Sequence, residues 1–253
     1  MLKIALSGCN GRMGRAITEL ASQRGDLEIV AGFDAVPTKL STYPVYADPF
    51  EYTGEVDVCV DFSAASALDH LLAYCVPRGI PLLLATTGHS DAQLAALRTA
   101  SEQIAVFKSP NMSLGVAVLR DLVCRATRIL GADYDIEIVE RHHNQKLDAP
   151  SGTALALAHD VQAELPFEAE LVYDRHERRE KRPKNEIGMH ALRGGTIVGE
   201  HEVMFAGTNE VISISHSAQS REVFASGALH AAKYLVGREP GIYDMRDLVA
   251  SIN

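Results

Sequence analysis

The stretch 140–153, ERHHNQKLDAPSGT, concentrates groups that bind anions and move protons. Two adjacent histidines, His142 and His143, are followed within four residues by Lys146. Imidazole and ammonium groups donate hydrogen bonds, and either can deliver a proton to a reacting molecule. The stretch therefore predicts a site for a small dicarboxylate, with one group free to act as an acid.

The end of this stretch has the pattern of a helix N-terminus. Ser151, Gly152 and Thr153 follow a proline and lead into the helical run TALALAHDVQAEL. Backbone N–H groups and two hydroxyls at such a terminus suit a ligand carboxylate. The alternative is a plain N-cap, but capping leaves His143 and Lys146 without a role.

Metal binding is not predicted. If the strand before His142 persists, the adjacent imidazoles point to opposite faces and cannot chelate one ion. His190 and His201 lie elsewhere without H-E-x-x-H spacing. The four cysteines form no C-x-x-C pair, so we expect them to fill core space.

A glycine turn near the N-terminus, GCNGRMG, indicates a dinucleotide site. Gly8, Gly11 and Gly14 lie between a strand pattern and a helical pattern, where N–H groups can approach a pyrophosphate. Asn10 stands where the usual G-x-G-x-x-G has its second glycine, so a tight structural turn is the alternative. Asp34 favours the dinucleotide, because an acidic residue at the end of the second strand accepts hydrogen bonds from a ribose.

Asp34 also bears on which dinucleotide binds. A carboxylate repels a 2′-phosphate, and Ala35 supplies no guanidinium to offset that repulsion. The sequence predicts that NADH is used at least as well as NADPH, although Lys39 could reach the phosphate.

Two further turns, ATTG at Ala85–Gly88 and SPNMS at Ser109–Ser113, follow strand patterns. Ligands of doubly wound sheets lie outside the carboxyl ends of the strands, so these turns are expected to contact the nicotinamide. Helix capping by Thr87, Ser90 and Ser113 is the alternative.

The elements that must position these residues alternate along the chain. Strand patterns occur at 2–6, 28–34, 56–62, 80–88 and 103–110, with helical patterns at 15–25, 65–74 and 91–100. This alternation predicts an α/β, Rossmann-like doubly wound parallel sheet.

After Asn111 the pattern changes to that of an α+β domain on a mixed sheet. Helical runs at 115–130 and 153–165 surround a strand at 134–140, and strand-like runs follow at 195–205 and 210–217. The tail, 222–237 and 244–251, is helical again. We expect a dinucleotide-binding domain of residues 1–111 plus 222–253, and a substrate-binding and tetramerisation domain of residues 112–221.

Charge and hydropathy exclude some classes of function. The 253-residue chain has 24 basic and 33 acidic residues, a net charge of −9, which opposes binding to nucleic acid or anionic membrane. The sequence begins without an apolar leader and has no membrane-spanning run, so a cytoplasmic protein is predicted. The basic run Arg175–Lys184 is expected to be a solvated, mobile loop, with a nucleic-acid patch as the alternative.

The stretch ERHHNQKLDAPSGT resembles the signature of the bacterial dihydrodipicolinate reductase family. The resemblance covers the chain nearly end to end and includes GCNGRMG, ATTG, SPNMSLGV, RGGTIVGEH, SHSAQSR and GIYDMRDL. The resemblance implies a nucleotide-binding domain completed by the C-terminal helices, and a homotetramer built through the substrate-domain sheets. It also implies hydride transfer from NAD(P)H to a cyclic unsaturated dicarboxylate in lysine and diaminopimelate biosynthesis.

The same resemblance assigns roles to residues. His142 matches the family's proton donor or acceptor and Lys146 its proton donor. Substrate contacts are matched by His143, Gly152 and Thr153, and Arg221 matches an arginine near the domain hinge. The cofactor site is matched by Gly8, Cys9, Asn10, Gly11, Arg12, Met13, Asp34, Ala85, Thr86, Thr87, Ser109, Pro110, Asn111 and Met112.

The chain departs from the family pattern at three places. Ala85 replaces a glycine, Met112 replaces a phenylalanine, and DFSAAS lacks an arginine that some members have. These departures concern cofactor preference and nicotinamide stacking. Two alternatives to the reductase are an amino-acid dehydrogenase of related build and a non-catalytic NAD-sensing regulator.

Overall fold

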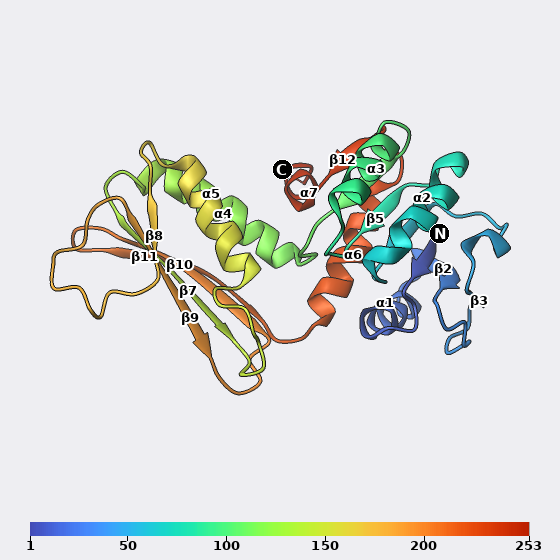
Figure 1. The fold of residues 1–253 in the computed structure, drawn as a ribbon, viewed down its shortest axis with the longest axis horizontal. Coiled ribbons are helices and arrows are strands. Elements are labelled where there is room, and N and C mark those ends of the chain that lie inside the picture. The colour runs from blue at the N-terminus through green and yellow to red at the C-terminus, as the bar shows by residue number, and fades with distance from the viewer. Residues whose placement is uncertain (253) are drawn as a thin grey trace. The chain divides into compact units, whose positions relative to one another are not determined.

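A computed structural model describes residues 1–252, which form two compact units (Figure 1). The first unit contains residues 1–114 and the C-terminal segment that begins at Glu222, and the second is Gly115–Arg221. The predicted fold class is confirmed: a parallel sheet covered by helices accompanies a smaller mixed sheet. No helix in residues 1–252 is long and apolar enough to cross a membrane.

The first unit is built on a parallel sheet of seven strands in the order β12-β6-β5-β4-β1-β2-β3. The strands are β1 (Leu2–Ser7), β2 (Leu27–Phe33), β3 (Val45–Tyr46), β4 (Val58–Asp61), β5 (Leu82–Leu84), β6 (Ala105–Lys108) and β12 (Gly241–Tyr243). The central strands are nearly all apolar because helices cover both faces of the sheet. The strand order reverses between β1 and β4, the place where doubly wound sheets bind ligands.

Two pairs of helices cover this sheet. Helices α2 and α3 share a core cluster with the sheet, whereas α6 contacts β4, β5, β6 and α1 (Figure 1). The helices are α1 (Arg12–Ser22), α2 (Leu68–Cys75), α3 (Asp91–Ser101), α6 (Glu222–Leu235) and α7 (Met245–Ala250), with short 3-10 turns η1 (Pro49–Glu51), η2 (Ala65–Ala67) and η3 (Val76–Arg78). The C-terminal helices thus complete the first unit, in agreement with their predicted return.

The second unit is a mixed sheet of five strands in the order β11-β10-β7-β9-β8. Its elements are α4 (Leu114–Leu130), β7 (Asp135–His142), α5 (Gly152–Glu164), β8 (Glu170–Val172), β9 (Glu186–Arg193), β10 (Gly199–Ala206) and β11 (Val211–Ala218). Helices α4 and α5 lie along one face of the sheet (Figure 1). Their apolar residues pack around Ile136 and Ile138. The predicted alternation of β7 is confirmed, and it continues so that Glu140 and His142 also face this core.

Two element predictions are wrong in detail, and one strand is missing from the prediction. The strand expected at 195–205 begins only at Gly199, because the chain turns at Gly195, whose φ is +48°. Strand β9 was not predicted, since its sequence EIGMHALR mixes helix-favouring residues with strand formers. The helix expected at 65–74 starts as a 3-10 turn and becomes α-helical only at Leu68.

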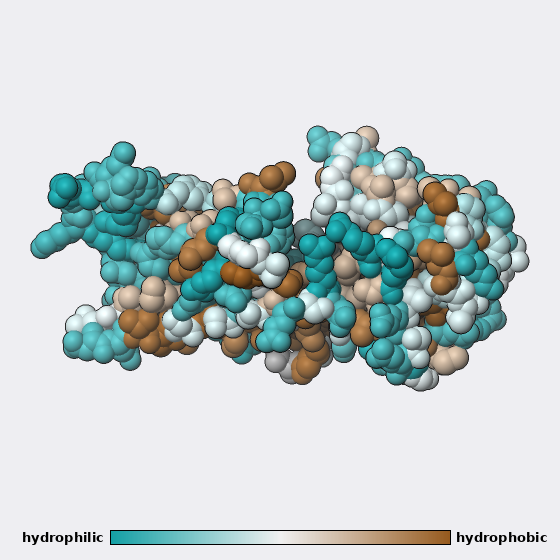
Figure 2. Space-filling view, turned by 90° about the horizontal axis from the view of Figure 1, so that it is seen from below, coloured by the Kyte–Doolittle hydropathy of each residue, from teal (hydrophilic) through white to brown (hydrophobic). Residues whose placement is uncertain are grey.

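The basic run 175–184 connects β8 to β9 as a mostly exposed loop, and three of its arginines are paired with carboxylates. Arg175 and Arg178 both pair with Glu186, which is buried, and Arg182 pairs with Glu137. Ionised pairs that bury one partner hold a loop more firmly than exposed pairs do. The run is therefore anchored to the sheet, and Figure 2 shows that this end of the second unit remains hydrophilic at its surface.

Candidate active site

The glycine turn after β1 has a backbone that side chains would block. Gly8 has a φ of +74°, and a Cβ there would lie 2.7 Å from the carbonyl oxygen of Phe62. At Gly14 a Cβ would lie 2.3 Å from the carbonyl oxygen of Gly8. Gly11 is the N-cap of α1 and has no side chain to cover the helix terminus. The turn leaves the N–H groups of α1 open to an anion, so the residues present fit a pyrophosphate.

Asn10 has a definite role at the position where a glycine was expected. Its amide nitrogen Nδ2 donates to the carbonyl oxygens of Val36 and Thr38, at 2.8 and 3.0 Å. Its backbone N–H donates to Asp34 Oδ2 at 3.0 Å, and Val36 N donates to Oδ1 at 3.1 Å. Asn10 and Asp34 thus join the glycine turn to the segment after β2.

Cavities follow the carboxyl edge of the parallel sheet. One of about 430 Å³ has Gly8, Gly11 and Asp34 among its walls, next to the strand-order reversal. A second, of about 230 Å³, is lined by Met13, Phe62, Ala85, Pro110, Asn111, Met112 and Phe224. Thr86, Thr87, Ser109 and Pro110 line a third, of about 180 Å³. Most predicted cofactor residues are therefore gathered along one edge of the first unit.

Three predicted cofactor residues line none of these cavities. Cys9 is buried beneath the turn, and burial, helped by the charge of Asp34, raises its pKa to about 11. Asn10 is occupied by its bonds to the segment after β2, and Arg12 is exposed at the start of α1. Cys9 therefore stays a protonated thiol, which agrees with the expectation that the cysteines fill core space.

Asp61 is a site residue that the sequence analysis missed. It ends β4, is fully buried, and its Oδ2 accepts from Thr86 Oγ1 at 2.7 Å. Its Oδ1 accepts from the backbone N–H of Ser63 at 3.1 Å. Asp61 therefore holds the turns after β4 and β5 in one arrangement. The sequence did contain a signal for Asp61: it is a carboxylate at the end of an apolar strand, and a buried charge requires hydrogen-bond partners.

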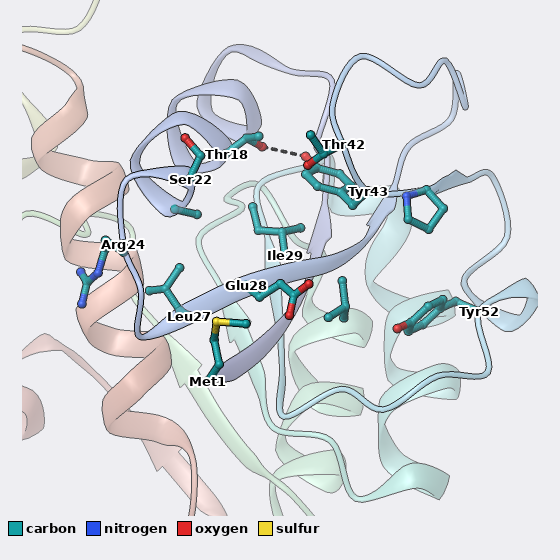
Figure 3. A pocket seen from close by; sticks show the side chains of 13 residues that line it. Met1, Thr18, Ser22, Arg24, Leu27, Glu28, Ile29, Thr42, Tyr43 and Tyr52 are labelled. Atoms are coloured by element: carbon teal, nitrogen blue, oxygen red, sulfur yellow. Dashed lines mark hydrogen bonds between the residues drawn. The ribbon is translucent and has the colours of Figure 1, made fainter.

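A further groove, of about 620 Å³, lies between α1, β2 and the segment before β3 (Figure 3). Thr18 Oγ1 and the Tyr43 hydroxyl are hydrogen-bonded across it at 2.6 Å. None of the predicted site residues lines this groove. It is therefore separate from the candidate cofactor site.

In the second unit, the end of β7 carries a buried ionic cluster. The Glu140 carboxylate is fully buried and lies 2.6 Å from His142 Nδ1. Two guanidinium nitrogens of Arg193, at the end of β9, donate to its two oxygens at 2.7 Å each. Burial raises the pKa of Glu140, but the bonds from Arg193, His142 and the Ser151 N–H outweigh burial and leave that pKa lowered. The cluster therefore holds an ionised carboxylate inside the unit.

Ser151 joins this cluster to helix α5. Its hydroxyl accepts from Ala154 N at 3.2 Å, so Ser151 is the N-cap of α5, which was the alternative considered for this turn. Its backbone N–H donates to Glu140 Oε1 at 3.0 Å, and its Oγ lies 3.0 Å from His201 Nε2. No atom lies within 4 Å of the place where a Cβ of Gly152 would stand, so space is open beside the first turn of α5.

The remaining predicted residues of the second unit lie in different surroundings. Lys146 Nζ pairs with Asp148 Oδ1 at 2.8 Å, and the Nδ1 atom of His143 is buried without a partner in the described part of the chain. Thr153 lies in the first turn of α5. Arg221 is exposed at the end of the unit. No cluster of three metal-ligating side chains occurs in that same range.

His201 is a second residue that the sequence analysis did not place in the site. Burial, followed by the charge of His142, lowers its pKa from 6.5 to about 4. Its ring meets that of His142 edge to face, with centroids 5.2 Å apart. His201 is therefore a neutral imidazole that supports the N-cap of α5.

We expect acid to destabilise the protein through His201. The unfolded chain binds this proton more tightly, so stability is full above about pH 6.5 and falls as the pH drops toward 4. At pH 5 the loss from this group is about 2 kcal/mol. Urea unfolding at pH 7 and pH 5 measures it: His201→Gln should reduce the difference, whereas His159→Gln, an exposed site on α5, should not. An equal pH dependence in all three proteins would contradict the assignment.

A parallel-sheet unit with a glycine cradle, accompanied by a unit with cationic and hydrogen-donating groups at a helix N-terminus, defines a two-domain nicotinamide-dependent oxidoreductase. Comparison with family models matches residues 2–112 to the N-terminal domain of dihydrodipicolinate reductase and residues 115–249 to its C-terminal domain. The chain belongs to the dihydrodipicolinate reductase family.

Individual relatives agree with this assignment. A 4-hydroxy-tetrahydrodipicolinate reductase of Caldanaerobacter subterraneus is 52% identical over 249 residues, 98% of each chain. That of Clostridium tetani is 47% identical over 97% of this chain and 96% of its own. The structure of a dipicolinate-bound dihydrodipicolinate reductase from Paenisporosarcina sp. TG-14 matches with a TM-score of 0.81 over 98% of this chain and 99% of that one. Its identity is 22%, so this match establishes the fold alone.

Proposed function

We propose that this chain reduces 4-hydroxy-tetrahydrodipicolinate to tetrahydrodipicolinate, in lysine and diaminopimelate biosynthesis, with a nicotinamide cofactor. The observation that carries the proposal is the cluster at residues 140–153, where Glu140 joins His142 to Ser151 at the open first turn of α5 and Lys146 lies in the connecting loop. Family membership supports the reaction, since the two relatives named above are reductases of this name.

The first unit binds the cofactor, which supplies the hydride when bound. The N–H groups of the glycine turn and of α1 hold the pyrophosphate, helped by the positive end of the helix dipole. Asp34 accepts from the adenosine ribose, and the turns at Ala85–Thr87 and Ser109–Met112 enclose the nicotinamide end. Asp61 keeps the first of these turns in place through Thr86.

The second unit binds the substrate and supplies the proton. One substrate carboxylate accepts from the N–H groups of Gly152 and Thr153, beside the space that Gly152 leaves open. Ser151 fixes that turn, and His143 donates to the same dicarboxylate. Lys146 donates a proton as negative charge develops on the ring, and His142 exchanges a proton nearby. Arg221, exposed at the end of the second unit, is a further substrate contact in this proposal.

A coupled assay that generates the unstable substrate tests the proposal by the loss of reduced-nicotinamide absorbance. We expect turnover with this substrate and none with a panel of amino acids or simple carbonyl compounds. Turnover only with an amino acid would indicate the related dehydrogenase, and cofactor binding without any turnover would indicate a sensor.

NADH should be used at least as well as NADPH, because the Asp34 carboxylate repels a 2′-phosphate. Asp34→Asn removes that charge and keeps an acceptor oxygen for the Asn10 N–H. We expect the ratio of kcat/KM for NADPH to kcat/KM for NADH to rise about tenfold. This is the effect expected from removing one charge that repels a nearby phosphate. Asp69→Asn, an exposed carboxylate on α2, is the matched control. A wild-type enzyme with a strong NADPH preference would contradict this assignment.

We also infer a homotetramer and a cytoplasmic location. Helices cover one face of the five-stranded sheet, and the strand residues Leu192 and Val211 are exposed. Association through the sheets would bury such side chains. Light scattering after size-exclusion chromatography should give about four times the chain mass. The cytoplasmic location is supported by the reaction itself, because the reaction requires the cell's pool of nicotinamide cofactor.

A further inference from the structure

We propose that Glu140 is a positioning residue that fixes the tautomer of His142, with Arg193 as the group that makes this possible. This role rests on the proposed function, because it determines which ring nitrogen of His142 is available for proton exchange. Glu140 lies two residues before His142 on the same face of β7, and both side chains are buried.

Four donors surround the Glu140 carboxylate. Oε2 lies 2.7 Å from Arg193 Nη1 and 2.6 Å from His142 Nδ1. Oε1 lies 2.7 Å from Arg193 Nη2 and 3.0 Å from the Ser151 N–H. Two oxygens offer about four lone-pair sites. Every site is therefore used, and no position is left for a proton on the carboxyl group.

This arrangement determines which nitrogen of His142 carries hydrogen. Arg193 and the Ser151 N–H can only donate, and a carboxylate can only accept, so Nδ1 of His142 must donate. In neutral His142 the other nitrogen, Nε2, then keeps its lone pair. Nε2 makes no hydrogen bond in residues 1–252 and stands beside Gly199, where a Cβ would come within 3.1 Å of it. Nε2 is thus the nitrogen presented for proton exchange.

The other charged and titratable groups around the pair do not compete for Nδ1. Arg193 ends β9, and His201, on β10, has its Nε2 atom 3.0 Å from Ser151 Oγ. His216 on β11 lies opposite His201 in the strand register. From the loop after β7, Lys146 pairs with Asp148. Glu140 is therefore the partner that orients the His142 ring.

Glu140→Gln provides a selective test, because an amide has one accepting and one donating end. In either orientation the amide NH2 meets one Arg193 nitrogen, which can only donate. The choice is decided by the second neighbour: the Ser151 N–H cannot accept, but His142 Nδ1 can if its proton moves to Nε2. The amide NH2 should therefore face His142 and reverse its tautomer. The oxygen then stays on Ser151, so the carboxylate-binding turn of α5 is kept.

The expected result is a fall in kcat on the order of 10²-fold, with KM changed less than about threefold. Long-range ¹H–¹⁵N spectra of the histidine rings should show hydrogen on Nδ1 of His142 in the wild type and on Nε2 in Glu140→Gln. Glu137→Gln is the matched control: Glu137 also lies on β7 and pairs with a histidine and an arginine, His190 and Arg182, but on the other face.

Two outcomes overturn the proposal. One is hydrogen on Nε2 of His142 in the wild type, which can be read even if Glu140→Gln does not fold. The other is a folded Glu140→Gln whose kcat equals that of Glu137→Gln. A wild-type protein without reductase turnover would instead refute the proposed function, while the ring spectra would still test the positioning role.

Discussion

Lys146→Ala is expected to lower kcat at least about 10²-fold and to raise KM in the same variant. A positioned general acid contributes on the order of 10²–10⁴-fold, and alanine removes this acid. The ammonium group also attracts the dicarboxylate, so its loss weakens binding in the ground state. The side chain is about one-fifth exposed and is held near Asp148, which keeps the charge at the surface of the site. Steady-state kinetics with the generated substrate measure both constants.

Lys181→Ala is the matched control for this variant. It removes the same charge from the same unit, at an exposed position of the loop between β8 and β9. We expect its kcat and KM to stay within about twofold of wild type, because exposed charges far from a site are screened by salt. A Lys146→Ala protein with wild-type kcat would show that another group delivers the proton.

Local patterns were sufficient to predict the parallel sheet and the position of its ligand edge. The apolar runs of β4 and β5, and the glycines between β1 and α1, depend only on neighbours in the chain. The elements that escaped prediction are short or atypical. Strands β3 and β12 have two and three residues, and β9 joins the sheet because β7 and β8 flank it.

The contacts of Glu140 could not be predicted in the same way. Strand register places Arg193 opposite His142, and His201 opposite Glu140. Register between strands far apart in the sequence is set by the packing of whole faces, and no local motif encodes it. One signal was available, because the alternation of β7 puts the Glu140 carboxylate on the buried face, where it must have partners.

The basic run 175–184 shows the same limitation. Its composition resembles that of a solvated loop, yet Arg182 reaches Glu137 and the backbone oxygen of Ile136 on β7. The sequence does not reveal that Arg175 and Arg178 form ion pairs with the buried Glu186. Charge patterning predicts exposure, but the partners of a charge depend on the fold around it.

Gly14→Ala is expected to abolish measurable cofactor binding and to lower the free energy of unfolding by about 2–3 kcal/mol. The added Cβ would lie 2.3 Å from the Gly8 carbonyl oxygen and 2.6 Å from the Cys9 Cα. Both are backbone atoms, so the glycine turn itself must move, and overpacking of this kind typically costs about 1–3 kcal/mol.

Displacing the turn also moves the N–H groups of Arg12 and Met13, at the uncapped start of α1, away from the cofactor, which is why binding should suffer more than folding does. Titration of NADH by fluorescence and urea unfolding measure the two effects. Gly25→Ala is the matched control, because no atom lies within 4 Å of a Cβ there. Equal affinities of Gly14→Ala and Gly25→Ala for NADH would contradict this prediction. They would show that cofactor binding does not depend on the close packing of α1 against the glycine turn.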